Sequence, residues 1–399
     1  MNYACHKKML MMLRKHSEDS IVRVGIITWY DWMNFGTVLQ AAALNTVINE
    51  MGYECETIQY IPDYSKKSLE DYMLDCIKSI MRNGLRKKKN IVQPENSSRG
   101  KNLKFEVFRN QYIKFGKPIN KSNLRFTLKT YNAVLYGSDQ IWMPWFFKPE
   151  MFGKWVCAHK RIAFAPSMGD IHELENVPEK IKRQILTYIK QYQYLSFREK
   201  RTGEYLKENY GIESVHVIDP VLLLTKEQWE ERCIKTVCNL SHYVLIYLLD
   251  ESDRIMKTKY IMDIAKKMNR KVLFIVRFPE DGEFDCERIF DIGPGEFIDL
   301  IKNADLIYTD SFHGIVFSTI FQKPFIPVER KIGEGRVGQN DRIYSYLEMM
   351  GLETHICTFQ PETDMERSQR INWSLINLII ENAKNDSYNY LQSSLKSVL

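Results

Sequence analysis

Residues 22–60 read VRVGIITWYDWMNFGTVLQAAALNTVINEMGYECETIQY and contain the pattern that decides the fold. The apolar run at 22–28 predicts a short buried strand, and the segment after the Asn-Phe-Gly loop predicts a helix. The helix is indicated by apolar residues at helical spacing, namely Leu44, Val47, Ile48 and Met51. Gly52 suits the position just after a helix, and residues 55–58 predict a second strand. The stretch is therefore a strand, a helix and a strand.

The same alternation continues through the rest of the chain. Short apolar segments with strand character occur at 133–136, 161–165, 194–196, 215–218, 243–249, 271–276, 306–308 and 325–328. Helical stretches separate most of them, an arrangement that is typical of α/β proteins with parallel sheets. A chain of 399 residues is long enough for two domains. We expect one at 1–225, with a basic insert near 76–130, and another at 226–371. We also expect a C-terminal helix at 372–399 that crosses back to the first domain.

Composition excludes several classes of protein. Hydrophobic residues make up 44% and charged residues 27%, which suits a globular chain rather than a disordered or fibrous one. No run approaches the roughly 20 apolar residues that a membrane-spanning helix needs, and the first 20 residues lack the cleavage site of a secretory signal. The eight cysteines include no C-x-x-C pair, a usage typical of reduced thiols. We therefore expect a cytoplasmic protein.

The net charge of +6 comes from one segment. Residues 76–130 hold 15 Lys or Arg and two acidic residues, whereas the rest of the chain holds 41 basic and 48 acidic residues. The densest part, 82–89, precedes a run rich in Pro, Asn, Ser and Gly and predicts a loop. A solvated loop fits this pattern as well as a patch that attracts anionic lipids at the inner face of the membrane, or a polyanionic glycan. Nucleic acid is not an expected partner, because the sequence contains no groove-reading module.

Polar and small residues gather where the predicted strands end. Ligands of open parallel sheets bind beyond the carboxyl ends of the strands, where helix N-termini offer free N–H groups. The candidate residues at these ends are Asn34, Gly36, Gly137, Ser138, Asp139, Ser167, Arg198, Asp310, Ser311, His313 and Gly314.

Several of these motifs also have a local explanation. The Asn34 motif fits a tight loop, and the Gly137 motif fits a turn followed by a helix N-cap. Ser196-Phe-Arg-Glu199 fits a capping box. Arg198 then lies in the first turn of a helix, where the helix dipole disfavours a cation, and a bound anion would remove the conflict. Asp219 precedes a proline and is interpreted as structural.

Asp310-Ser-Phe-His-Gly314 is the most specific of these motifs. It begins a predicted helix directly beyond the strand at 306–308. His313 falls in the first turn of that helix, where the macrodipole opposes protonation of the ring and favours a bound anion. Ser311 can donate a hydrogen bond to a phosphate oxygen. A functional role is favoured here over a structural one.

Several common catalytic motifs are absent from the sequence. No G-x-G-x-x-G follows the first strand, and no G-x-x-x-x-G-K-[ST] occurs, so dinucleotide and P-loop chemistry have no support. H-E-x-x-H and G-x-S-x-G are missing as well. We expect neither a metal site nor a cofactor.

Seven blocks together resemble the polysaccharide pyruvyl transferase family. In chain order they are Val24-Gly-Ile-Ile-Thr28 with Asn34-Phe-Gly-Thr-Val-Leu-Gln40, Tyr136-Gly-Ser-Asp-Gln-Ile-Trp142, Phe164-Ala-Pro-Ser-Met-Gly169, Ser196-Phe-Arg-Glu199, Val217-Ile-Asp-Pro-Val-Leu-Leu-Leu224, Thr309-Asp-Ser-Phe-His-Gly-Ile-Val-Phe317 and Asn340-Asp-Arg-Ile-Tyr-Ser-Tyr-Leu347. They cover about residues 22 to 360. The resemblance implies a fold like that of the GT-B glycosyltransferases, in which two Rossmann-like domains face each other across a cleft. The first domain would then hold the acceptor and the second the donor.

The resemblance also implies a reaction. Members of the family transfer pyruvate from phosphoenolpyruvate onto two hydroxyls of one sugar of a cell-surface or extracellular polysaccharide, or of its lipid-linked precursor, forming a ketal. The family places the donor's anionic groups against an arginine and a histidine, here Arg198 and His313. Such a reaction needs an acid, a base and an anion clamp, and His313, Asp139 and Asp310 are the candidate acid–base groups. Phosphoenolpyruvate would be a substrate, and no cofactor is implied.

Two alternatives stay open. The same two-domain scaffold suits a glycosyltransferase that uses a nucleotide sugar. It also suits a catalytically silent relative that binds a glycan and releases no phosphate.

Overall fold

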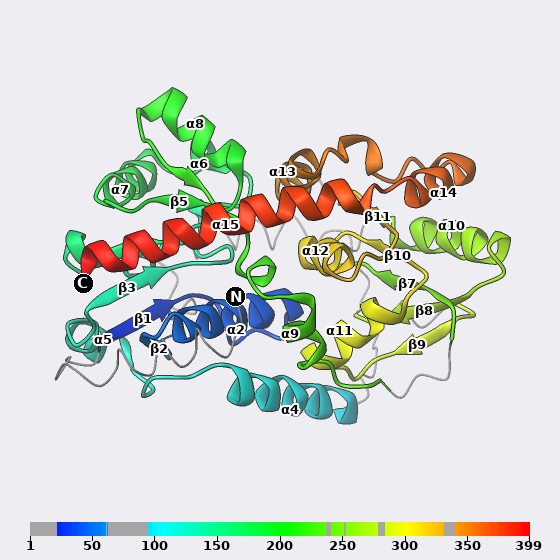
Figure 1. The fold of residues 1–399 in the computed structure, drawn as a ribbon, viewed down its shortest axis with the longest axis horizontal. Coiled ribbons are helices and arrows are strands. Elements are labelled where there is room, and N and C mark those ends of the chain that lie inside the picture. Colours follow the sequence, from blue (N-terminus) through cyan, green and yellow to red (C-terminus); the bar gives the residue numbers. More distant parts are fainter. Residues whose placement is uncertain are drawn as a thin grey trace, which may run out of the picture.

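The computed structural model describes residues 22–60, 62, 95–236, 241–250, 253–277, 284–330 and 340–399. The densest part of the basic segment, 82–89, lies outside these residues. The loop prediction is wrong for the Asn, Ser and Gly residues that follow, because residues 96–100 belong to helix α4 (Glu95–Tyr112). The described chain forms two parallel sheets that lie side by side with helices around them (Figure 1).

The first sheet has the strand order β2-β1-β3-β4, and every pairing in it is parallel. Its strands are β1 (Arg23–Ile27), β2 (Glu54–Thr57), β3 (Ala133–Tyr136) and β4 (Arg161–Ala163). Helix α2 (Phe35–Glu50) joins β1 to β2, so the predicted strand, helix and strand are confirmed. A parallel pair, β5 (Ser196–Phe197) and β6 (Val215–His216), lies next to this sheet, with an isolated bridge from Tyr194 to Ile162 of β4.

Helices and short 3-10 turns surround the first sheet. The helices are α4 (Glu95–Tyr112), α5 (Lys121–Leu128), α6 (Glu173–Asn176), α7 (Glu179–Ile189), α8 (Lys200–Tyr210) and α9 (Lys226–Glu230). The 3-10 turns are η1 (Pro144–Phe146), η2 (Pro149–Phe152), η3 (Ala158–Lys160) and η4 (Pro220–Leu222).

The second sheet has the order β11-β10-β7-β8-β9 and is also parallel. Its strands are β7 (Tyr243–Tyr247), β8 (Lys271–Ile275), β9 (Glu287–Ile289), β10 (Leu306–Thr309) and β11 (Phe325–Pro327). The helices that follow in this half are α10 (Arg254–Lys267), α11 (Pro294–Asn303), α12 (Phe312–Ile320), α13 (Asp341–Met350), the turn η6 (Glu353–His355) and α14 (Pro361–Gln369). Every residue of β3, β7 and β10 is buried, as expected for parallel strands with helices on both faces.

Helix α2 lies where the two sheets meet, and most of its residues are buried. Its first residue, Phe35, stacks on Phe297 of α11 at 4.4 Å between ring centroids and on Phe105 of α4 at 5.3 Å. One hydrophobic cluster therefore runs from the first sheet into the second. This packing fixes the start of α2 against the second half of the protein.

The last helix, α15 (Trp373–Val398), runs across both halves (Figure 1). The Tyr390 hydroxyl donates to the Ala163 carbonyl at the end of β4, and the Ser387 hydroxyl accepts from the Ile218 N–H, so the helix contacts the first half. It also packs on α13 of the second half. Among the described residues, no helix is both long enough and apolar enough to span a bilayer.

Candidate active site

A cavity of about 360 Å³ lies between the two halves of the protein, at the carboxyl ends of the strands. The loops after β1 and β3 and the start of α2 contribute Trp29, Trp32, Asn34, Thr37, Asp139, Gln140, Met143 and Phe146. The second half contributes Leu249, Ser311, Phe312, His313, Arg330 and Arg342. The structure thus brings four of the predicted site residues, Asn34, Asp139, Ser311 and His313, around one cavity.

Asn34 and Asp139 are held in place by local hydrogen bonds. Asn34 caps helix α2, and its Oδ1 accepts from the N–H groups of Gly36 and Thr37 at 3.1 and 3.5 Å. Asp139 accepts from the Thr37 hydroxyl at 2.7 Å and from the Gln140 N–H at 2.9 Å. These contacts fix the Asp139 carboxylate on the cavity wall.

His313 contacts the first half through Gly36. A β-carbon built on Gly36 would lie 1.9 Å from Nδ1 of His313, so only a glycine allows the helix to approach the ring this closely. On the other side of the ring, Nε2 lies 3.4 Å from Oδ2 of Asp219. The ring is therefore confined from both sides.

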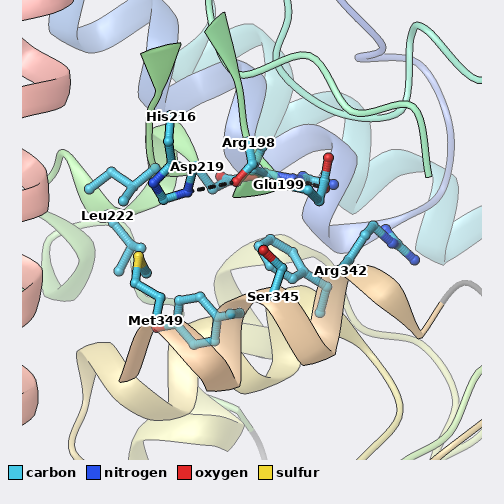
Figure 2. Close-up of a pocket in the computed structure, with 11 residues that line it drawn as sticks. Arg198, Glu199, His216, Asp219, Leu222, Arg342, Ser345 and Met349 are labelled. Atoms are coloured by element: carbon cyan, nitrogen blue, oxygen red, sulfur yellow. Dashed lines mark hydrogen bonds and ion pairs between the residues drawn. The ribbon is translucent and has the colours of Figure 1, made fainter. Parts of the chain in front are cut away.

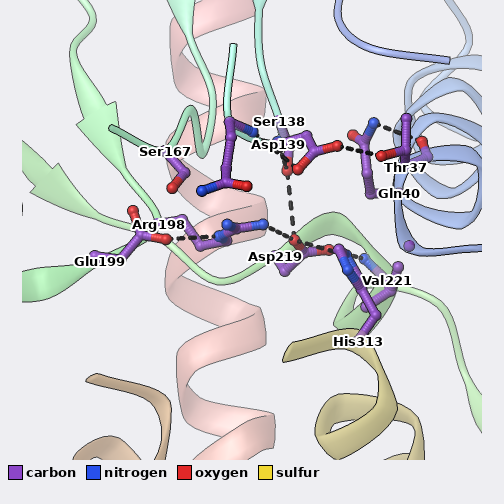
Figure 3. A network of polar contacts seen from close by, with 12 residues as sticks. Thr37, Gln40, Ser138, Asp139, Ser167, Arg198, Glu199, Asp219, Val221 and His313 are labelled. Atoms are coloured by element: carbon purple, nitrogen blue, oxygen red, sulfur yellow. Dashed lines mark hydrogen bonds and ion pairs between the residues drawn. The ribbon is translucent and has the colours of Figure 1, made fainter. Parts of the chain in front are cut away.

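Asp219 is the centre of a buried polar network (Figure 3). Its Oδ2 accepts from Nη1 of Arg198 at 2.8 Å and from the Ser138 hydroxyl at 3.5 Å, and Oδ1 accepts from the Val221 N–H. Burial raises the pKa of Asp219, but the nearby His313 and Arg198 lower it more, so the group stays ionised. Asp219, interpreted from the sequence as structural, is the residue that joins His313 to Arg198.

Arg198 is buried and does not line the large cavity. Its Nε bonds Glu199 at 2.9 Å, its Nη1 bonds Asp219, and its guanidinium lies 4.4 Å from the Phe312 ring centroid. Burial lowers the pKa of Arg198, but Glu199 and Asp219 more than offset this effect. Two carboxylates already neutralise Arg198.

A second, smaller cavity of about 20 Å³ lies next to the Asp219 network, between the ends of β5 and β6 and helix α13 (Figure 2). Arg198, Glu199 and His216 approach it from above in that view, and Arg342, Ser345 and Met349 approach it from below. Its volume is too small for a substrate. Arg342 and Phe312 line both cavities and so separate them.

The remaining candidate site residues of the first half do not line the large cavity. Ser138 is fully buried, and its hydroxyl accepts from the Asp139 N–H at 2.6 Å. Ser167 is fully buried as well and accepts from the Gly169 N–H. Gly137 has a φ of 125°, and a β-carbon there would meet the Phe164 carbonyl oxygen at 2.0 Å. These residues shape the strand end rather than line the cavity.

The residues of the motif at 310–314 have different structural roles. Ser311 caps α12 by accepting from the Gly314 N–H, and a β-carbon on Gly314 would meet the Thr309 hydroxyl at 2.7 Å. Asp310 is fully buried and accepts from the N–H groups of Leu249 and Asp250 at 2.7 and 2.8 Å. Burial raises the pKa of Asp310. Its carboxylate holds the loop after β7 and does not line the large cavity.

Arg330 and Arg342 are cavity residues that the sequence did not single out. Nε of Arg330 donates to the Asp310 carbonyl at 3.0 Å, and the Arg330 backbone is bonded twice to the side chain of Asn340. Burial and the neighbouring cations Arg330 and Arg198 lower the pKa of Arg342 to about 9. Arg342 lies in one of the seven sequence blocks, the one at 340–347. Its place in that block could have identified it as a site residue.

No group of three or more His, Cys, Asp or Glu side chains within the described ranges is arranged to hold a metal ion. The groups that face the large cavity are instead cations, a histidine, a carboxylate and amides. This set of groups suits an anionic ligand next to a neutral hydroxylated one.

The fold is GT-B-like: two Rossmann-like domains with parallel sheets face each other across a cleft. Arabidopsis thaliana UGT89C1 in complex with UDP-L-rhamnose is similar, with a TM-score of 0.50, 11% identity, and coverage of 96% of this chain and 100% of that one. UDP-GlcNAc 2-epimerases are also similar. The Neisseria meningitidis protein bound to UDP-GlcNAc has a TM-score of 0.47 and 13% identity, and the match covers 93% of this chain and 99% of that one. The Methanocaldococcus jannaschii protein has a TM-score of 0.47 and 14% identity, and the match covers 88% of this chain and 92% of that one.

The model of the polysaccharide pyruvyl transferase family matches residues 34–332. The chain belongs to this family, which confirms the resemblance seen in the seven blocks. It is therefore a transferase-family protein with a role in polysaccharide modification. No curated protein matches the chain in sequence.

Proposed function

We propose that the protein transfers pyruvate from phosphoenolpyruvate onto two hydroxyls of one sugar, in a cell-surface or extracellular polysaccharide or its lipid-linked precursor. Family membership supports a transferase. The observation that carries the choice of donor is the cationic wall formed by Arg330 and Arg342, which line the cavity together with His313 of the first turn of α12.

Phosphoenolpyruvate has a phosphate and a carboxylate, so its site needs several positive groups. Arginine forks and helix N-termini are the groups that bind such anions best. Burial and two neighbouring cations hold down the pKa of Arg342, and a bound dianion would relieve that repulsion. Arg330 and Arg342 are therefore proposed as the donor clamp. Arg198 is proposed to act indirectly, through its hydrogen bond to Asp219, which lies beside His313.

The reaction requires one proton delivered and two removed. Protonation of C3 of phosphoenolpyruvate makes C2 an oxocarbenium-like centre, to which one sugar hydroxyl adds with loss of its proton. The C2–O bond to phosphate then breaks, and the second hydroxyl adds at C2. One hydroxyl proton replaces the proton given to C3, and the other leaves with inorganic phosphate. His313 is proposed as the acid and Asp139, from the other domain, as the base.

The network around His313 suits this role. Asp219 is buried and ionised next to Nε2, so it orients the imidazole. Gly36 limits movement on the other side. Asp219 is therefore a positioning residue for His313.

Phosphate release and product mass test the proposal. Purified protein is incubated with phosphoenolpyruvate and cell-envelope glycans of the source organism. We expect release of inorganic phosphate that depends on the glycan, and a glycan product heavier by pyruvic acid less one water. His313→Ala should lower the rate by about 10²–10⁴.

Two results would contradict the proposal. Transfer of a sugar from a nucleotide sugar to the same glycans would assign the protein to the glycosyltransferases. Glycan binding with no phosphate release at saturating phosphoenolpyruvate would indicate a silent glycan-binding relative.

A further inference from the structure

The two domains contribute chemically different residues to the large cavity. The second domain contributes the cations Arg330 and Arg342, together with His313. Loops of the first domain contribute large apolar side chains, namely Trp29, Trp32, Met143 and Phe146. The proposed donor accounts for the cationic residues only.

The apolar residues of the first-domain loops include large side chains that a folded protein usually buries. Trp32 is 55% exposed and Phe146 is 48% exposed, and their neighbours in sequence, Met33 and Trp145, are 47% and 49% exposed. Large apolar side chains that gather on the surface beside a cavity usually mark a ligand or partner site. The Trp29 and Trp32 rings lie 5.9 Å apart and are inclined at 49°, so they do not cover each other face to face.

The loop that bears the two tryptophans is anchored on both sides. The Trp29 carbonyl accepts from Nε2 of Gln40 at 2.8 Å, and the Asp31 carboxylate pairs with Arg109 of α4 at 3.1 Å. On the other loop, the Phe146 N–H bonds the Met143 carbonyl. The aromatic side chains are therefore presented by fixed backbone, which lowers the entropy cost of binding.

We propose that Trp29, Trp32 and Phe146 form a subsite that stacks on the pyranose ring of the acceptor. This inference rests on the proposed function and deepens it, because it assigns acceptor recognition to aromatic stacking on the first domain. One face of many pyranose rings consists of C–H bonds, and such a face packs on an indole or phenyl ring. The hydroxyls lie around the edge of the sugar ring and remain available for hydrogen bonds.

The polar groups beside the aromatic subsite fit a neutral sugar. Asn34, Thr37, Asp139 and Gln140 line the same cavity. Nε2 of Gln140 is a buried donor that has no hydrogen-bond partner among the described residues. The Asp139 carboxylate accepts hydrogen bonds from hydroxyls but repels an anion. These residues of the first domain therefore suit a neutral, hydroxylated ligand better than an anionic one.

The two proposed acid–base groups come from different domains. Asp139 of the first domain and His313 of the second line the same cavity. The hydroxyl that loses a proton and the carbon that gains one would therefore be served by different domains.

Saturation-transfer NMR in the absence of phosphoenolpyruvate tests this inference. The probes are the methyl β-D-glycosides of glucose, galactose, mannose and N-acetylglucosamine, with uridine as a comparison. We expect at least one glycoside to receive saturation, mainly at its ring C–H protons. Trp32→Ala and Phe146→Ala should each weaken that binding by about tenfold.

The matched control is Phe126→Ala. Phe126 is 67% exposed on α5 of the same domain and does not line the cavity, so its removal should leave the signals unchanged. Equal saturation in wild type and Trp32→Ala, or saturation of uridine but of no glycoside, would overturn the inference.

The same samples separate this inference from the proposed function. Phosphoenolpyruvate titrated into Trp32→Ala should bind as it does to the wild type. Glycoside binding without phosphoenolpyruvate binding would preserve the subsite and defeat the proposed donor. Phosphoenolpyruvate binding without glycoside binding would support the proposed donor and contradict the aromatic subsite.

Discussion

The α-carbon of Gly36, in the first domain, lies against the imidazole of His313, in the second. A β-carbon at position 36 would lie 1.9 Å from Nδ1 and 2.4 Å from Cγ of that ring. Asp219 lies on the other side of the ring, 3.4 Å from Nε2. The position of His313 therefore depends on both domains, and a small change in the first domain can displace the proposed acid.

Gly36→Ala should lower activity without unfolding the protein. The added methyl group must push His313 away, and a displacement of about 1 Å of a catalytic group costs roughly 10²-fold in rate. The measurement is phosphate release per enzyme at saturating substrates, together with the far-UV circular dichroism spectrum.

Gly203→Ala is the control for this variant. Gly203 is also in a helix, but a β-carbon there would meet only the Ser214 hydroxyl, at 2.7 Å. Its activity should stay within twofold of wild type. Full activity in Gly36→Ala would show that the position of His313 does not matter.

Arg198→Ala should destabilise the protein. Arg198 is the ion-pair partner of Glu199 and Asp219 in a buried network, so its loss removes the arginine that both carboxylates share. Breaking such a pair costs about 3–5 kcal/mol, and Tm should fall by several degrees in a thermal scan.

The exposed pair Arg201–Glu348 provides the comparison for Arg198. Its side chains are about half exposed and 3.2 Å apart, so Arg201→Ala should change stability by less than about 1 kcal/mol. An unchanged Tm in Arg198→Ala, with weaker donor binding, would instead favour the role predicted from the sequence, that of a direct donor clamp.

Donor binding should weaken in alkaline solution because of Arg342. Its pKa in the free protein is about 9, so above that pH the donor must bind together with a proton. Affinity for phosphoenolpyruvate should fall by up to about tenfold per pH unit above pH 9, well beyond the range in which the phosphate itself titrates. Calorimetric titrations from pH 7.5 to 10 measure this slope. Arg342→Gln should bind more weakly at pH 7.5 and lose the slope, whereas an identical slope would exclude Arg342 from the donor site.

Asp341→Asn should stabilise the protein at neutral pH. Burial, followed by the neighbouring carboxylate of Asp170, raises the pKa of Asp341 to about 6. Because the folded state binds this proton more tightly than the unfolded state, the stability contributed is present below pH 4 and lost as pH rises through 6. An amide removes that loss, and we expect a gain of about 1 kcal/mol at pH 7.5 after solvent screening.

The gain should vanish at pH 4, where Asp341 is protonated in the folded wild type. Tm measured across this pH range tests the prediction. A gain that persists at pH 4 would mean that ionisation of Asp341 is not its cause.

The fold was readable from the sequence where the signal is local. Strands such as β3 and β7 are short apolar runs, and a run of that kind can only be buried. Strand β9 was missed because two of its three residues, Glu287 and Arg288, are charged and exposed at the sheet edge. Its pairing with β8 is a tertiary contact, which no local pattern predicts.

The candidate site was readable only in part. Asn34, Asp139 and His313 follow strands in conspicuous motifs, and parallel strands direct their carboxyl ends to one crevice. The role of Asp219 depends on contacts with Arg198 and His313, which are remote in sequence. Trp32 and Arg330 have no motif around them, and only the closing of two domains on one cavity reveals them.

The most direct test of the central claim is a titration that asks which donor the cationic wall binds. Phosphoenolpyruvate and UDP-GlcNAc are titrated separately into wild type and Arg342→Gln at pH 7.5, by calorimetry and by the shift in Tm. We expect saturable binding of phosphoenolpyruvate that raises Tm, is at least about tenfold weaker in Arg342→Gln, and has no counterpart with UDP-GlcNAc. Stabilisation by UDP-GlcNAc without any response to phosphoenolpyruvate would contradict the account.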